Sequence, residues 1–317
     1  MQSLARLAMR TRFEIVIADE ADPAHLRSAG EAALAEVDDA ETLLSAYRDD
    51  AHLFRVNALA GRQAVRVDAR LLAVLARAMD QCIACDGAFD LALGALLQAW
   101  NLAGMADGTE VQLPGEDVIQ AALGQSGMRR HLHLDAERTT VRFSTPGLRL
   151  DAGAIGKGYA LEQSEVVLRG LGIRSALMHG GTSTVCALGS APDASPWRVA
   201  IRHPVDGHAH IATAALRDTS MSVSAVHGRS VRIAGRRFGH VIDPRSGWPV
   251  DGNLLAAVMH PSALVSDSWS TALLVLGSSG LQALSQRCPE ASFLLVRRED
   301  QGQLAVDIVG RGFARQG

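Results

Sequence analysis

The sequence has few cysteines, no long apolar run and no block of like charge. Four cysteines are scattered over 317 residues, too few for a disulfide framework in a chain of this length. Apolar runs of 18 or more residues do not occur, so no membrane-spanning helix is expected. The formal net charge is −3, with both signs interspersed. This balance argues against nucleic-acid or membrane-surface binding, which requires a basic face.

The N-terminal segment, residues 1–19, also lacks targeting features. It contains no apolar core with a small-residue cleavage site and no cysteine for lipid attachment. We therefore expect a cytoplasmic chain, or a periplasmic one if a leader was trimmed. Because 48% of the residues are hydrophobic, the chain can bury a large core as one domain or as two closely joined lobes.

Cys82 and Cys85 form a C-x-x-C pair within an apolar-periodic stretch that predicts a helix. No strand precedes the pair and no further metal ligands lie nearby, so we expect buried core cysteines. Further helices are predicted over 23–47, capped by Asp22, over 68–85, capped by Asp68, and over 261–277, whereas 47–57 is predicted as a polar loop. Helices and strands alternate without a βαβ rhythm, which favours an α+β fold.

The glycine-rich segment RLDAGAIGKGYALEQ, residues 149–163, suggests a phosphate loop. It departs from the P-loop pattern because Asp151 replaces the first glycine and Gly158 follows Lys157 where Ser or Thr is required. The dinucleotide pattern G-x-G-x-x-G is missing as well. Its glycines would still let backbone N–H groups at a helix start approach an anion. A glycine-rich helix entry needed only for packing explains the segment equally well.

Two other segments carry candidate chemistry. His240 and Asp243 lie in GHVIDPRSGWPV, which pairs a titratable group with a turn, although H-x-x-D-P alone is weak evidence. Asp267 and Thr271 lie four residues apart, on one face of a predicted helix. Carboxylate and hydroxyl oxygens suit magnesium. From the residues alone, a helix cap at Asp267 and a core-facing Thr271 are the better interpretation.

Taken in order, these segments resemble the FAD:protein FMN transferases, the ApbE family. The similarity extends from MRTRFEI through SAYRDDAHLFRVN, GAFDLALGALLQAW, LDAGAIGKGYALE, HGGTSTVCALG and WRVAIRHP to GHVIDPRSGWP and SDSWSTALLVLG. It departs from the family where MGT is MRT, GGIAKG is GAIGKG and TSG is VSA. The resemblance implies one ApbE-like domain over 1–317, an α+β fold of two intertwined lobes with mixed or antiparallel sheets and packed helices.

The resemblance also implies a reaction and a site. Family members use Mg²⁺, or another divalent metal, to transfer FMN from FAD to a Ser or Thr hydroxyl of an acceptor flavoprotein, and AMP leaves. Matched positions imply metal ligation by Asp267, Thr271 and the Ala154 carbonyl, and a base at His240 or Asp267. They imply FAD contacts at Met9, Tyr47, Asn57, Trp100, Asn101, Leu102, Asp151, Lys157, Ile242 and Asp243. Hydrolysis of FAD to FMN and AMP, or flavin binding without catalysis, are the alternatives.

Overall fold

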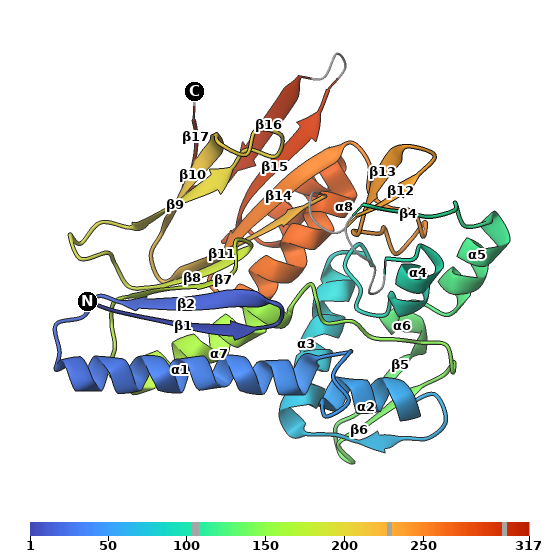
Figure 1. The fold of residues 1–317 in the computed structure, drawn as a ribbon, viewed down its shortest axis with the longest axis horizontal. Helices are drawn as coiled ribbons and strands as arrows, with labels where there is room; N and C mark the ends of the chain where they lie inside the picture. Colours follow the sequence, from blue (N-terminus) through green and yellow to red (C-terminus); the bar gives the residue numbers. More distant parts are fainter. Residues whose placement is uncertain (103–107, 227–229, 300–302, 317) are drawn as a thin grey trace.

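The fold is built on an eight-stranded antiparallel sheet (Figure 1). The computed structural model describes residues 1–102, 108–226, 230–299 and 303–316. In spatial order the strands are β1 (Gln2–Ala8), β2 (Thr11–Ile17), β7 (Ala176–Gly180), β8 (Thr184–Leu188), β11 (Thr219–Ala225), β14 (Asn253–His260), β15 (Ser292–Arg298) and β16 (Leu304–Val309). Every neighbouring pair is antiparallel. The predicted α+β class with antiparallel pairing is therefore confirmed.

Three helices pack against this sheet: α1 (Pro23–Leu44), α7 (Gly156–Gly170) and α8 (Ala263–Arg287). The Asp22 carboxylate caps α1 as predicted, accepting two backbone N–H groups at 3.1 Å. Ser262 caps α8, which bends at Gly277, where φ is 65°. The crossing of α7 and α8 requires glycine at 158, because a Cβ there would lie 2.2 Å from the Ala263 carbonyl oxygen.

The opposite sheet face packs on a small sheet ordered β17 (Phe313–Arg315), β10 (His210–Leu216) and β9 (Trp197–Arg202). Alternation along the central strands divides the two cores, since successive side chains point to opposite faces. In β14, Ala256 and Val258 belong to the large helix-covered core, whereas Leu255 and Ala257 belong to the second core. The central strands are therefore buried on both sides.

The remaining elements surround one end of the helical layer (Figure 1). They are α2 (His52–Leu59), β3 (Val65–Arg66), α3 (Ala69–Ala84), α4 (Gly94–Ala99), β4 (Thr109–Glu110), α5 (Glu116–Gly124), α6 (Met128–His131), β5 (Leu132–Asp135), β6 (Thr140–Phe143), β12 (Ser230–Ile233) and β13 (Arg236–Gly239). A third small core, which includes Leu96, Trp100 and Ile119, joins α4, α5 and β12.

Most sequence expectations about local structure are confirmed, and two are wrong. Asp267, expected from the residues alone to cap a helix, lies inside α8, whose cap is Ser262. Cys82 and Cys85 are buried core residues, as predicted. The predicted polar loop at 47–57 instead contains the start of α2, which has no side-chain cap at Ala51 and buries Leu53 and Val56. Across the described ranges, none of the helices combines the length and apolarity that a bilayer span needs.

Candidate functional site

A cavity of about 860 Å³ opens beside the central strands of the large sheet. Its walls come from the loop before α7, the first turns of α8, strand β11, the β9–β10 hairpin and the segment after β13. Nine of the fourteen predicted site residues line it: Tyr47, Leu102, Asp151, Ala154, Lys157, His240, Ile242, Asp267 and Thr271. The other five, all within the described ranges, lie outside its lining: Met9, Asn57, Trp100, Asn101 and Asp243.

Asp267 is the most deeply buried charged group of the cavity wall, with 4% of its surface exposed. Its Oδ2 accepts a hydrogen bond from the Gly158 N–H at 3.0 Å, and its Oδ1 accepts one from the Thr184 hydroxyl at 3.4 Å. Burial raises the pKa of the Asp267 carboxyl, while the charge of Lys157 and these two hydrogen bonds oppose that rise. The carboxylate therefore sits where a further cation would stabilise its ionised form.

Thr271 lies one turn after Asp267 and connects to β11 through hydroxyl groups. The Thr271 hydroxyl donates to the Asp267 carbonyl oxygen at 3.4 Å and lies 3.1 Å from the Ser224 hydroxyl. Ser224 also lies 2.8 Å from the Ser270 hydroxyl. Ser224 comes from the VSA segment and itself lines the cavity, yet the sequence analysis gave it no role. Its hydroxyl fixes the orientation of the Thr271 hydroxyl.

The glycine-rich loop brings three predicted groups to the same wall. Ala154 and Asp267 both line the cavity. Gly158, four residues after Ala154, donates its N–H to the Asp267 carboxylate. The Lys157 ammonium lies within 3.5 Å of the Gly153 carbonyl oxygen and lines the cavity. Helix α7 has no side-chain cap at Ile155, as expected of an anion-binding helix start. The Gly158 N–H in the first turn of α7, however, donates to Asp267 rather than to a ligand.

Asp151 and Tyr47 form a hydrogen-bonded pair at the cavity edge. The Tyr47 hydroxyl donates to Asp151 Oδ2 at 2.6 Å, and Oδ1 accepts the Gly153 N–H at 2.8 Å. Asn57 supports this pair from below the surface. Its side-chain amide donates to the Leu150 carbonyl oxygen at 2.9 Å, and its oxygen accepts the Leu150 N–H at 2.8 Å. Asn57 therefore holds the segment before Asp151 and lies outside the cavity lining.

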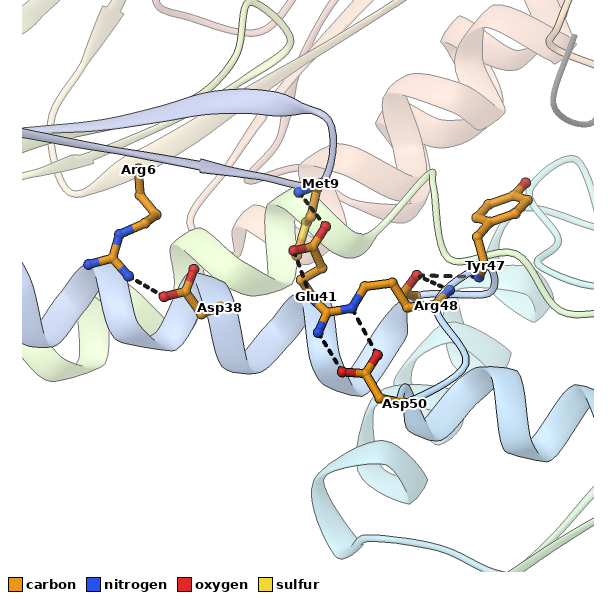
Figure 2. Close-up of polar contacts among 8 residues, drawn as sticks. Arg6, Met9, Asp38, Glu41, Tyr47, Arg48 and Asp50 are labelled. Atoms are coloured by element: carbon orange, nitrogen blue, oxygen red, sulfur yellow. Dashed lines mark hydrogen bonds and ion pairs between the residues drawn. The ribbon is translucent and has the colours of Figure 1, made fainter.

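Met9 occupies the tip of the β1–β2 hairpin, outside the cavity lining (Figure 2). Met9 and Arg10 both adopt left-handed backbone, with φ of 49° and 61°, which explains why a small residue suits position 10. The Met9 N–H donates to Glu41 Oε1 at 2.8 Å, and Glu41 Oε2 accepts Arg48 at 3.2 Å. These bonds hold the hairpin, the end of α1 and the loop of Tyr47 together.

Trp100 and Asp243 also serve to position the wall. The buried indole N–H of Trp100 donates to the Gly247 carbonyl oxygen at 2.8 Å. Asp243 accepts two hydrogen bonds from the Arg245 guanidinium, at 2.8 and 2.7 Å. Asn101 is exposed, with a left-handed φ of 53°. Of the two residues of the H-x-I-D-P motif, His240 lines the cavity and Asp243 lies outside its lining.

Several polar residues of the lining were missed by the sequence analysis. Thr182 and Ser183 follow the adjacent glycines of HGGTSTVCALG, and His179 lies on the same side, its Nδ1 3.0 Å from the Gly181 carbonyl oxygen. The available signal was the glycine pair, since Gly181 has a φ of 64°. The glycine pair therefore marks a tight bend, and the residues that follow it line the cavity.

The fold matches solved structures of ApbE proteins. The apo form of the Pseudomonas stutzeri flavinyl transferase ApbE matches with a TM-score of 0.80 and 29% identity, covering 97% of this chain and 94% of that chain. The ApbE protein of Thermotoga maritima matches in fold with a TM-score of 0.85 and 23% identity, over 96% of each chain.

The chain belongs to the ApbE family, whose pattern matches residues 9–295. A relative from Treponema pallidum named FAD:protein FMN transferase is 30% identical over 324 aligned positions, covering 98% of this chain and 88% of its own length. The resemblance inferred from the eight sequence segments is therefore confirmed.

Proposed function

We propose that this chain transfers FMN from FAD to a Ser or Thr hydroxyl of an acceptor flavoprotein, with Mg²⁺ and with release of AMP. Family membership supports flavin transfer, since the relatives carry that name. The observation that carries the proposal is one wall that presents a buried carboxylate, a hydroxyl and a lysine to a cavity of about 860 Å³.

The donor set of this wall fits a hard divalent cation. Asp267 would supply a carboxylate oxygen, Thr271 a hydroxyl and Ala154 a main-chain carbonyl, all of the oxygen type that Mg²⁺ prefers. The raised pKa of Asp267 has its cause in burial, and a nearby cation would favour the charged form. When bound, Mg²⁺ would neutralise charge on the diphosphate.

The other residues have roles that follow from their places. Lys157 would hold the diphosphate beside the metal ligands, and the Tyr47–Asp151 pair would contact FAD at the cavity edge. The acceptor hydroxyl oxygen forms a bond to the phosphorus of the FMN moiety as the bond from that phosphorus to the bridging oxygen breaks. The hydroxyl proton passes to His240 and AMP carries away the bridging oxygen.

The direct test is to incubate the purified protein with FAD, Mg²⁺ and a peptide carrying an acceptor threonine. We expect the peptide to gain the mass of covalently attached FMN, with one AMP released for each FMN transferred. A matched peptide with valine at that position should stay unmodified, and chelation of Mg²⁺ should stop both products. AMP release without peptide modification would instead establish FAD hydrolysis, and bound FAD without either product would establish a binding protein.

Ser224 offers a test of how the Thr271 hydroxyl is held. Ser224→Ala should raise the Mg²⁺ concentration needed for half-maximal activity by about tenfold, because loss of a supporting hydrogen bond weakens metal ligands by that order. Ser222→Ala is the matched control: Ser222 lies two residues earlier on β11 and bonds Ser266 at 3.0 Å, not Thr271. Ser224→Thr should restore the wild-type Mg²⁺ dependence. Equal Mg²⁺ dependence in both alanine variants would contradict this role.

A further inference from the structure

A second set of donor atoms lies at the two ends of α8, away from the cavity lining. His260 is the last residue of β14, Cys288 follows the end of α8, and Glu290 lies two residues further on. The ligand atoms of the three side chains lie within 4.8 Å of one another. His260 Nε2 and Glu290 Oε1 are 3.8 Å apart. The three groups approach from a strand, a helix end and a turn.

We propose that His260, Cys288 and Glu290 bind a Zn²⁺ ion or a similar transition metal. An imidazole nitrogen, a thiolate sulfur and a carboxylate oxygen are the mixed donors that Zn²⁺ takes, whereas Mg²⁺ takes oxygen alone. The buried Cys288 sulfur would form the inner side of the site. The Glu290 side chain is 61% exposed and the His260 side chain 14%, so a water molecule can occupy a fourth, outward position.

Metal binding at His260 Nε2 would change the hydrogen bonds of the other ring nitrogen, Nδ1. In the structure His260 Nδ1 accepts the Ser262 N–H at 2.9 Å, and it also lies 3.4 Å from the Ser262 carbonyl oxygen. With Zn²⁺ on Nε2 the ring proton would reside on Nδ1, so the Ser262 N–H would give up this acceptor and the Nδ1–H would turn to the Ser262 carbonyl oxygen. The Cys288 thiol loses its proton to solvent as the Zn–S bond forms. Glu162 is the other charged group acting on His260, and it is already paired with Arg77 at 2.7 Å.

The metal site would cross-link the two ends of α8, the helix that carries Asp267 and Thr271. Strands β14 and β15 pair directly, with Met259 opposite Ser292. The residues just before α8 and just after it therefore lie next to each other. A metal bound by His260 and Cys288 would link the residue before α8 to the residue after it, and closing a long segment in this way stabilises the folded state. The inference concerns stability and stands independently of the proposed flavin transfer.

The experiment is to titrate metal-free protein with ZnCl₂ while following thermal unfolding, and with CoCl₂ while following absorbance. We expect saturating Zn²⁺ to raise the melting temperature by about 2–4 °C. Co²⁺ should give a thiolate charge-transfer band. That band should vanish in Cys288→Ser, although Cys82, Cys85 and Cys186 remain. If Zn²⁺ leaves the melting temperature unchanged and Co²⁺ gives no such band, the proposal is overturned.

Three further variants locate the ion. Glu290→Gln alters an exposed side chain and should weaken Zn²⁺ affinity by about tenfold or more without unfolding the protein. Glu299→Gln, in a surface glutamate that pairs with Arg297, is the matched control and should bind Zn²⁺ as wild type does. Asp267→Asn should also keep the full Zn²⁺ effect. Its loss in Asp267→Asn, or equal affinity in both glutamine variants, would place the ion elsewhere and overturn the proposal.

Discussion

Replacing Asp267 with asparagine is expected to reduce FMN transfer by at least about a hundredfold, because a metal that polarises a phosphoryl group contributes several kcal/mol to the transition state. The amide keeps the shape of the carboxylate. The amide oxygen can accept the Gly158 N–H. The amide nitrogen can donate to the Thr184 hydroxyl, which in the wild-type protein donates to the Asp267 carboxylate. Activity should therefore fall without loss of the fold. Steady-state transfer rates at saturating FAD and a series of Mg²⁺ concentrations measure the effect.

The stability of the same variant provides the control. Burial raises the folded-state pKa of Asp267 above its unfolded value, so the contribution of this group to stability is present in acid and lost as pH rises through the folded pKa. Asparagine stays neutral at every pH. In a chelator, Asp267→Asn should therefore gain stability relative to wild type as pH rises from about 4 to 7. Melting temperatures across that range check this, and a stability difference between the two proteins that does not change with pH would contradict it.

Mg²⁺ should reverse the order of stability of the two proteins. A cation that binds the wild-type carboxylate stabilises the folded state by mass action, whereas the asparagine variant lacks the charge. Activity loss together with an unchanged response of melting temperature to Mg²⁺ would mean that Asp267 acts by some route other than metal binding.

Local sequence signals predicted those parts of the site that depend on neighbours along the chain. Asp22 and Asp68 cap their helices as expected, each accepting backbone N–H groups of its first turn. The spacing of Asp267 and Thr271 placed both on one face of α8, and the cavity contains both. These features follow from helix geometry, which nearby residues determine.

Two of the predicted site residues outside the cavity lining make their contacts between distant segments. Asn57 bonds Leu150, 93 residues later, and the Trp100 indole bonds Gly247, 147 residues later. No periodicity or cap in the sequence reports such bonds. The resemblance located these positions near the flavin, but it could not distinguish a side chain that lines the cavity from one that supports the wall behind it.

His240→Asn is expected to slow FMN transfer by about a hundredfold or more while leaving FAD affinity nearly unchanged, as removal of a general base requires. His240 is half-buried and lines the cavity, after the end of β13. Asp267, the other candidate base, is assigned to the metal, and its two oxygens accept the Gly158 and Thr184 donors. Single-turnover transfer rates and FAD binding, measured on the same preparation, separate the two effects.

The pH dependence distinguishes a base from a residue that only shapes the cavity. A base works when deprotonated, so the wild-type rate should rise with pH along one limb, and His240→Asn should lose that limb. His210→Asn is the matched control, since His210 is an exposed histidine of the same lining, and it should keep the limb. An unchanged transfer rate in His240→Asn would rule out the role. A flattened profile confined to that variant would show that the acceptor proton leaves through His240, with Asp267 left to the metal.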